Sequence, residues 1–416
     1  MEKAPLTVEK APFTAYQRRL FVFLSVATFF EGYDFFALSQ LLTSIRETYG
    51  LSPEQGTWLV TLINFGTMIA YVLVRSADRW GRRRVLSITI AGYALFTFLS
   101  ALAPNAIMFG VLQMIARVFL IGEWATSMVV AAEEFPAERR GTVIGVVSAS
   151  AGLGSIVCAG VVPLLLKTPL GWRSVYLLGV LPLLLLMYAR RNLKETRRFA
   201  ERAAQGPLDP PLLEILRGPH RRRVLEMALI WFLSYICTSN AVLFWKEFAL
   251  AERGLTHGQT GLIVSVAAVV SMPLVFFAGG MLDAIGRRWG SAVIYLATVL
   301  GVLGAYTLHG VVPLLICMTL GIFGLNAVLT VLNAFMTELF PTEARGNAMA
   351  WSNNLLGRLG YCLSPLLIGE LVGEHGWGLP LRLTTLFPLV ALGLIFFWLP
   401  ETNARELEET SRASGA

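Results

Sequence analysis

Twelve long apolar segments recur along the chain and leave no room for a large soluble domain. Each is close to or above the ~20 residues that a helix needs to cross about 30 Å of hydrocarbon. Because lipid offers no hydrogen-bond partners to irregular backbone, such segments predict membrane-spanning helices and an all-α polytopic membrane protein. The predicted spans are residues 19–41, 57–77, 85–104, 107–132, 142–166, 174–189, 224–245, 261–282, 290–309, 311–336, 347–369 and 378–399.

The basic residues are distributed unevenly about these spans. Two of the 34 Lys and Arg residues, Arg117 and Arg358, lie deep inside spans. The connections on one side hold six: Arg46, Lys167, Arg173, Lys246, Arg253 and Arg382. The tails and the alternate connections hold the other 26, an asymmetry that predicts two cytoplasmic termini. The net charge of +7 is then an orientation signal, and no nucleic-acid partner is expected.

The cysteines and the N-terminal segment give no evidence for a metal site, a disulfide framework or a cleaved signal peptide. The four cysteines lie in separate apolar spans without metal-binding spacing, so we read them as small buried hydrophobes. The first span is too long for a cleaved signal peptide. We expect a monomer embedded in the lipid bilayer of the plasma membrane, which is the inner membrane if the source is bacterial. We expect no metal or cofactor.

An internal repeat relates the two halves of the chain. Three pairs of segments share an offset of 205 residues: DRWGRRR (78–84) with DAIGRRW (283–289), EEFPAERRG (133–141) with ELFPTEARG (338–346), and Trp172 with Trp377. The LKET and LPET segments that end the halves are offset by 206. One register kept over half a chain indicates duplication, with both copies oriented alike in the membrane. We therefore predict six-helix bundles at 1–189 and 224–416, joined by a cytoplasmic linker at 190–223.

At these motifs the chain resembles the major facilitator superfamily. The loop VRSADRWGRRR is similar to the family pattern G-x-L-x-D-R-x-G-R-R, with Val74 and Ser76 at the Gly and Leu positions, and GGMLDAIGRR repeats it. The resemblance implies two pseudo-symmetric bundles that work by alternating access, with Asp78 and Arg82 in a latch that stabilises the outward-facing state. The implied gating set is Asp78, Arg79, Gly81, Arg82, Arg83, Glu133, Arg140, Asp283, Gly286, Arg287, Arg288, Glu338 and Arg345.

The first span indicates which branches of the superfamily the chain resembles most. Its FFEGYDFF segment is similar to those of metabolite:proton and aromatic-acid:proton symporters, with Gly32 where Trp is usual. The PETNARELEE end resembles sugar porters and their organic-ion relatives. The antiporter pattern G-x-x-x-G-P-x-x-G-G is absent from the fifth span, which favours symport over drug efflux.

Five charged residues are expected at membrane depth: Glu31, Asp34, Arg117, Glu123 and Arg358. A charge near the bilayer centre costs at least about 2.5–3.5 kcal/mol, so each is a functional candidate. Glu31 and Asp34 lie about 17 and 21 Å along the first span, and Arg117 lies about 15 Å from the opposite surface, at a similar depth.

These charges suit proton coupling. Desolvation strengthens proton binding by a carboxylate and a nearby arginine weakens it, so moving the arginine switches the proton affinity. We predict Asp34 as the proton site, Glu31 as the second candidate, Arg117 as the partner and Glu123 as a further member. The alternative is a static ion pair between helices. The family's helix-four arginine aligns with Gln113, so Arg117 stands one turn later.

The second half lacks matching acids, because Ser239 and Ile236 stand at the positions equivalent to Asp34 and Glu31. It offers polar and aromatic residues instead, beginning with Trp231, and we expect Lys246 and Glu247 to be solvated at the outer edge. The predicted substrate-binding set is Tyr33, Arg117, Tyr235, Asn240, Trp245, Asn326, Asn353, Asn354 and Arg358.

Taken together, the sequence predicts a secondary active transporter that couples protons to symport of a small organic anion, either a carboxylate or an aromatic acid. Arginine in the cavity walls favours an anion, because guanidinium matches carboxylate geometry. The alternatives are a proton-coupled antiporter exporting drugs or metabolites, and a sugar or organic-ion porter. An enzyme is not expected, since the four histidines lie in loops or at span edges without a catalytic set.

Overall fold

The computed structural model describes residues 13–181, 184, 194–196 and 214–403, without the side chains of 76–79, 137–138, 140–141, 180, 214 and 342–343. Helices make up almost all of this part of the chain, which contains no strand. The elements are α1 (Ala15–Tyr49), α2 (Pro53–Trp80), α3 (Arg82–Ala101), α4 (Ala106–Glu134), α5 (Ala137–Leu165), α6 (Arg173–Leu177), η1 (Leu178–Val180), η2 (Glu214–Leu216), α9 (Arg221–Leu243), α10 (Trp245–Ala251), α11 (His257–Ile285), α12 (Arg287–Thr307), α13 (Val311–Leu339), α14 (Thr342–Met349), η3 (Ala350–Gly357), α15 (Arg358–His375), α16 (Gly378–Leu383) and α17 (Leu386–Trp398).

Eleven segments of the described residues are long and apolar enough to cross a membrane. Two of them combine several elements: Ala344–His375 takes in most of α14 together with η3 and α15, and Gly378–Trp398 joins α16 to α17. The sixth predicted span begins in α6 and η1 and then lies largely outside the described residues, as does the predicted linker. The all-helical prediction is confirmed.

The repeat is visible in the backbone. Gly81 separates α2 from α3 with φ 92°, and Gly286, 205 residues later, separates α11 from α12 with the same φ. This left-handed conformation favours glycine, which has no Cβ to clash with the backbone. The two loop motifs therefore make the same turn between corresponding helices.

Glycines also let the first bundle pack tightly. A Cβ on Gly32 of α1 would overlap the carbonyl oxygen of Ala151 on α5, and one on Gly154 would overlap that of Phe29. The helices can approach this closely only because both positions lack side chains. This close packing of α1 against α5 fixes the rotation of α1 about its axis, and therefore the direction in which Glu31 and Asp34 point.

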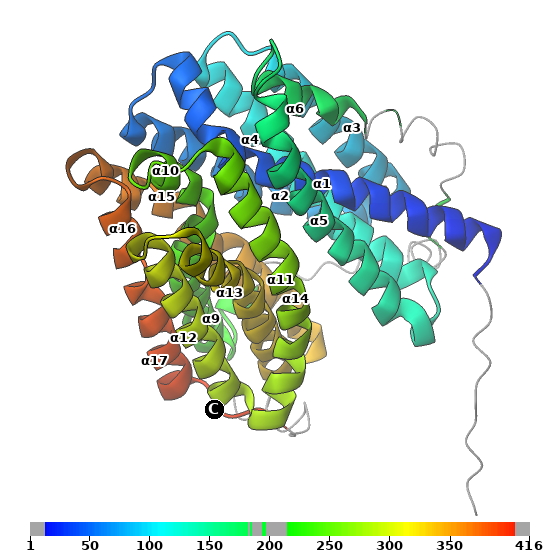
Figure 1. Cartoon of the computed structure of the whole chain (residues 1–416). Helices are drawn as coiled ribbons and strands as arrows, with labels where there is room; N and C mark the ends of the chain where they lie inside the picture. Colours follow the sequence, from blue (N-terminus) through cyan, green and yellow to red (C-terminus); the bar gives the residue numbers. More distant parts are fainter. Residues whose placement is uncertain (1–12, 182–183, 185–193, 197–213, 404–416) are drawn as a thin grey trace, which may run out of the picture.

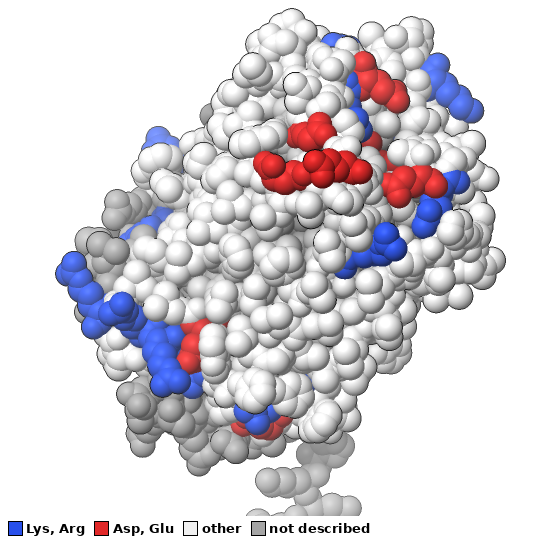
Figure 2. All heavy atoms as spheres, turned by 90° about the vertical axis from the view of Figure 1, so that its left-hand side faces the viewer, with Lys and Arg blue, Asp and Glu red and all other residues white. Residues whose placement is uncertain are grey.

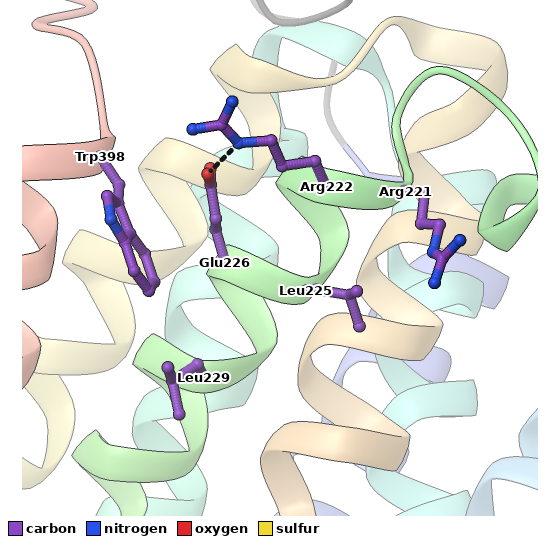
Figure 3. Close-up of a pocket in the computed structure, with 6 residues that line it drawn as sticks. All are labelled: Arg221, Arg222, Leu225, Glu226, Leu229 and Trp398. Atoms are coloured by element: carbon purple, nitrogen blue, oxygen red, sulfur yellow. Dashed lines mark hydrogen bonds and ion pairs between the residues drawn. The ribbon is translucent and has the colours of Figure 1, made fainter.

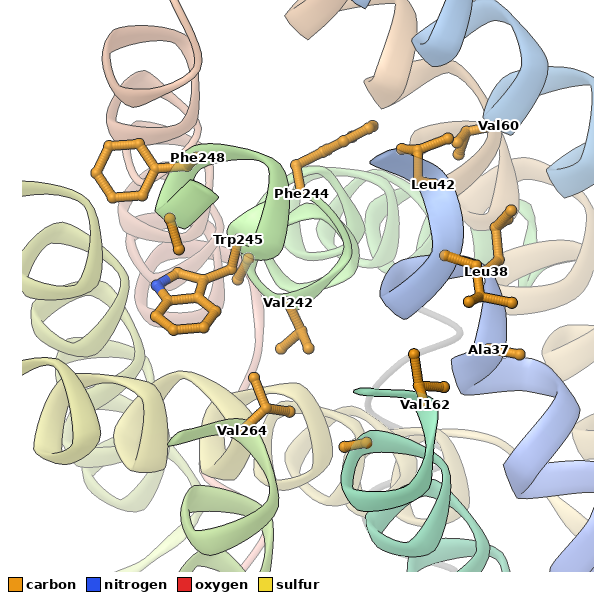
Figure 4. Packing of buried hydrophobic residues seen from close by; sticks show 14 of the residues in the cluster. Ala37, Leu38, Leu42, Val60, Val162, Val242, Phe244, Trp245, Phe248 and Val264 are labelled. Atoms are coloured by element: carbon orange, nitrogen blue, oxygen red, sulfur yellow. The ribbon is translucent and has the colours of Figure 1, made fainter. Parts of the chain in front are cut away.

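The two bundles meet at one end and diverge at the other (Figure 1). The largest apolar cluster contains residues of both bundles, among them Leu38 and Leu42 of α1 and Phe244, Trp245 and Phe248 of the second bundle (Figure 4). Two smaller clusters each lie within one bundle. The shared cluster is at the external ends of the helices, given cytoplasmic termini, so this conformation is closed on the external side, while the cytoplasmic ends of the two bundles lie further apart (Figure 1).

The surface charges agree with this orientation. Figure 2 shows acidic side chains gathered toward one end of the molecule and many basic ones toward the other. Exposed Glu47, Glu252 and Glu374 lie at external helix ends, whereas exposed Arg221 and Arg222 begin α9 at the cytoplasmic end. The predicted positive-inside arrangement thus holds for these described residues.

Candidate functional site

Both acids of α1 are buried at membrane depth. Glu31 and Asp34 are each 6% exposed. Asp34 accepts no well-aligned hydrogen bond from the described residues, and the side chain of Thr97 on α3 is its neighbouring hydroxyl group. Its Oδ2 lies beside Gly179 of η1, 3.8 Å from where a Cβ on that glycine would stand. Asp34 therefore points into the first bundle. A buried carboxylate with one hydroxyl neighbour and no cationic partner is better suited to carry a proton than to hold helices together.

Arg117 of α4 shares this environment. Its side chain is 4% exposed, and its guanidinium carbon lies 4.4 Å from the ring centre of Phe35. Nη1 has no hydrogen-bond partner, and no carboxylate pairs with Arg117 among the described residues. The alternative interpretation, a static ion pair between helices, is therefore not seen for Arg117 and Asp34 in this conformation. A desolvated guanidinium with an unused donor is poised to receive an anion.

Glu123 is completely buried one and a half turns further along α4. Its Oε1 accepts a hydrogen bond from Ser127 Oγ at 2.6 Å, while Oε2 has no partner among the described residues. Glu31 lies within electrostatic range of Arg117, Glu123 and Asp34. The structure thus places the four predicted proton-coupling residues in one charged group inside the first bundle.

The second bundle supplies an aromatic frame around Arg358. The guanidinium carbon of Arg358 lies 5.4 Å from the ring centre of Tyr235 and 5.8 Å from that of Tyr361. Tyr235 and Tyr361 meet edge to face, with ring centres 5.9 Å apart, and Trp231 lies 5.4 Å from Tyr235. Tyr235 Oη donates to Asn353 Oδ1 at 2.8 Å. The half-buried Arg358 has no carboxylate partner among the described residues and its Nε is unsatisfied.

A π-helical segment positions these groups. η3, Ala350–Gly357, is a π-helix that interrupts the membrane span between α14 and α15; it carries Asn353 and ends directly before Arg358. Segments of this kind are uncommon and occur often at functional sites. Gly360, in the next turn, lets α15 approach the backbone of Phe232 on α9, where a Cβ would clash. The wide turn and the close contact together bring Asn353 and Arg358 against Tyr235.

Tyr361 was not among the predicted site residues. It lies three residues after Arg358, and this spacing places both side chains on neighbouring faces of one helix. That spacing is the feature of the sequence from which Tyr361 could have been included in the site. The carbonyl of Tyr361 accepts a hydrogen bond from Asn64 Nδ2 on α2 at 3.4 Å, and the next residue, Cys362, contacts Thr67. The frame therefore adjoins the first bundle, and Arg117 lies within electrostatic range of Tyr361.

Other predicted substrate residues lie apart from this frame. Asn240 is fully buried and donates to the Ile236 carbonyl of its own helix. Asn326 likewise donates to Ile322, and Asn354 is half-buried. Trp245 is fully buried in the shared apolar cluster, and the hydroxyl of the buried Tyr33 has no hydrogen-bond partner among the described residues. No hydrogen bond, ion pair or ring contact joins any of these five to Arg358 among the described residues.

The expectation that Lys246 and Glu247 are solvated is wrong. They are 2% and 3% exposed because the seventh span breaks at Phe244, and the short helix α10 packs against α1. Lys246 Nζ donates to the Gln40 carbonyl of α1, and Glu247 accepts from Arg46 Nη1 at 2.6 Å. These polar contacts surround the apolar cluster and close the external side between the bundles.

The predicted gating residues form two similar cytoplasmic clusters. In the first bundle Arg82 pairs with Glu133 at 3.2 Å, and in the second Arg287 pairs with Glu338 at 2.7 Å and with Asp283 at 2.6 Å. The side chains of Asp78, Arg79 and Arg140 lie outside the described residues. Gly81, Arg83, Gly286, Arg288 and Arg345 lie at the same helix ends.

The two Glu-Thr pairs of the repeat complete these clusters. Glu195 accepts hydrogen bonds from the Arg82 and Arg83 amides at the start of α3, and Glu401 accepts those of Arg287 and Arg288 at the start of α12. Burial raises the pKa of Glu401. The hydrogen bonds that its carboxylate accepts from backbone amides together outweigh burial and hold the pKa below its ordinary value. Each carboxylate thus caps a helix N-terminus.

The following Thr of each pair bonds to the acid of the cluster. Thr196 Oγ1 donates to Glu133 Oε2 at 2.5 Å, and Thr402 Oγ1 donates to Glu338. The 206-residue offset of these segments marked them as equivalent in the sequence. Their capping role was not predicted, because each carboxylate reaches a helix more than a hundred residues away.

Comparison with known proteins agrees with this architecture. The profile of the Major Facilitator Superfamily matches residues 24–245 and 227–414. The gallate transporter of Pseudomonas putida is 26% identical over 442 residues, covering 96% of this chain and 94% of its own. The cis,cis-muconate transport protein of Acinetobacter baylyi is 28% identical over 377 residues, covering 86% and 88%.

A solved structure shares the fold. The inward-open xylose transporter of E. coli superposes with a TM-score of 0.77 at 18% identity, covering 94% of this chain and 98% of its own. The chain belongs to the Major Facilitator Superfamily. It is a multi-pass membrane transporter rather than an enzyme, and the bacterial origin of these relatives agrees with the predicted inner-membrane location.

Removal of the external ion pair should open the outer side. Glu247→Gln leaves Arg46 without its buried partner in the closed state only, so we expect the ratio of outward-open to closed molecules to rise about tenfold or more. Spin labels on Glu47→Cys and Glu374→Cys, one on each bundle, would report this in pulsed electron resonance as a larger long-distance population. The swapped pair, Arg46→Glu with Glu247→Arg, should return the distribution toward that of the parent. An unchanged distance distribution in both Glu247→Gln and Arg46→Gln would show that the ion pair does not hold the closure.

Proposed function

We propose that the chain is a proton-coupled symporter of a small carboxylate, preferably an aromatic one. The observation that carries this proposal is a pair of guanidiniums at membrane depth, Arg117 and Arg358, neither of which has a carboxylate partner among the described residues. A desolvated cation without an anion is costly. A substrate carboxylate would supply the missing charge.

The surroundings of Arg358 support an aromatic substrate. Tyr235 and Tyr361 flank its guanidinium, and Trp231 extends the ring surface. A substrate ring can stack edge to face on such a frame while its carboxylate meets Arg358. Relatives named for gallate and cis,cis-muconate, both organic acids, are consistent with this class.

The acids of the first bundle support proton coupling. Asp34 accepts no well-aligned hydrogen bond among the described residues and lies within electrostatic range of Arg117, so its protonation depends on where Arg117 stands. When a substrate anion occupies Arg117, that arginine no longer favours ionised Asp34. Substrate and proton would then load together, and neutralising both charges lowers the cost of moving the loaded site across the membrane.

Alternating access follows from the closure between the bundles. The external side is held by the shared apolar cluster, the Arg46–Glu247 ion pair and Lys246. To admit substrate from outside, these contacts must separate while the cytoplasmic ends approach. The repeated cytoplasmic clusters stand at the ends that would then meet, which suits the latch role proposed for Asp78 and Arg82.

A substrate panel tests the proposed class. In proteoliposomes we expect uptake of hydroxylated aromatic carboxylates, weaker uptake of aliphatic carboxylates and none of neutral sugars. Arg358→Gln should raise KM for the carboxylate about tenfold or more, since a charge-assisted hydrogen bond contributes about 1.5–3 kcal/mol, and Arg358→Lys should recover part of the loss. Arg382→Gln, at an external helix end, is the matched control. Uptake confined to sugars or organic cations would contradict the proposal.

Asp34→Asn should separate binding from coupling. We expect this variant to lose accumulation driven by an imposed pH gradient and to keep substrate exchange in counterflow, because exchange requires no net proton movement. Glu374→Gln removes an exposed carboxylate and serves as the control. If Asp34→Asn accumulates substrate normally while Glu31→Gln does not, Glu31 carries the proton. Normal accumulation by both variants would refute the proposed coupling site.

A further inference from the structure

A groove lies outside the transport pathway, at the cytoplasmic edge of the second bundle. It has a volume of about 430 Å³ and runs between the beginning of α9 and the end of α17 (Figure 3). Its lining residues are Arg221, Arg222, Leu225, Glu226, Leu229 and Trp398. The mechanism above uses none of them.

The groove spans the boundary between water and lipid. Arg221, Leu225 and Leu229 follow one another at four-residue intervals, so they share one face of α9. Leu225 and Leu229 are 44% and 40% exposed. A helix face that begins with arginine at the cytoplasmic end and continues as leucine in the membrane matches a lipid, whose charged headgroup lies above its acyl chains. Trp398 occupies the interfacial position that tryptophan favours in membrane proteins.

The charges in the groove are not balanced. Glu226 Oε1 accepts from Arg222 Nε at 2.8 Å, and its Oε2 accepts from Arg223 Nη1 at 2.8 Å. Arg223 also donates to the carbonyl of Trp398 at 2.7 Å, tying α9 to the end of α17. One carboxylate thus pairs with two of the three arginines that begin α9 and leaves Arg221 without a counter-charge among the described residues. The side chain of Arg221 has no hydrogen-bond or ion-pair partner among the described residues, and that of Arg222 is 87% exposed.

We propose that this groove binds the phosphate headgroup of an anionic phospholipid of the cytoplasmic leaflet. Arg221 and the free edge of Arg222 donate to the phosphate oxygens, a geometry that guanidinium suits. One acyl chain lies along Leu225 and Leu229, and the Trp398 ring covers the glycerol region. The bound lipid joins the first and the last helix of the second bundle, so it stabilises the bundle at its cytoplasmic edge.

The test measures lipid retention by the full chain. The purified protein is mixed with equal amounts of phosphatidylglycerol and phosphatidylcholine, and bound lipid is counted by native mass spectrometry. We expect retention of phosphatidylglycerol over phosphatidylcholine, and a fall of about fivefold or more in Arg221→Gln with Arg222→Gln. Arg221→Gln alone leaves the Glu226 pairs intact and should show a smaller loss. The double variant Arg18→Gln with Arg19→Gln removes two exposed arginines at the cytoplasmic start of α1 and should retain lipid as the parent does.

A second readout does not depend on counting adducts. Phosphatidylglycerol should raise the melting temperature of the parent in detergent, and this rise should shrink in Arg221→Gln. Equal retention of phosphatidylglycerol by the parent and the Arg221/Arg222 variant would overturn the proposal. The proposal would also be overturned if millimolar inorganic phosphate displaced the lipid and raised the melting temperature as much as phosphatidylglycerol does, because the groove would then be a phosphate site.

Discussion

The cost of placing charge in hydrocarbon is the constraint on which the rest of this structure depends. Glu31, Asp34, Glu123 and Arg117 are all nearly fully buried, and each lies inside the first bundle rather than against lipid. Such residues are tolerated only where they serve one another or a ligand. The acids accept few hydrogen bonds and Arg117 has no ion-pair partner among the described residues, which supports the proposal that this group changes its charge state during transport.

The same constraint explains the division of labour between two bundles of common origin. The repeat preserves the parts that position helices: Gly81 and Gly286 make the same turn, and Glu195 and Glu401 cap equivalent helix ends. The membrane-embedded residues have diverged, with acids in the first bundle and aromatic and amide groups in the second. Turns and caps are required by the shared fold, whereas the buried charges of the first bundle are the residues that the proposed proton coupling uses.

Much of the fold could be predicted from the sequence, because hydrophobic length and arginine placement follow from the membrane environment and the 205-residue register follows from duplication. The site was predicted in part. Lys246 was misplaced because the count along the seventh span assumed one unbroken helix, and the break at Phe244 turns the residue toward α1. Tyr361 was missed because, in the sequence, an aromatic residue in a membrane span cannot be told from one that only packs against its neighbours. The structure shows that the end of the π-helix places Arg358 over its ring.

Proton movement that accompanies substrate tests the central claim most directly. Liposomes containing the protein and a trapped pH indicator receive an aromatic carboxylate outside, with the membrane potential clamped and protein-free liposomes correcting for passive entry. Symport through the group around Asp34 predicts acidification of the interior that saturates with substrate. An interior that becomes alkaline, as in antiport, or a pH that does not change while substrate enters, would contradict the account.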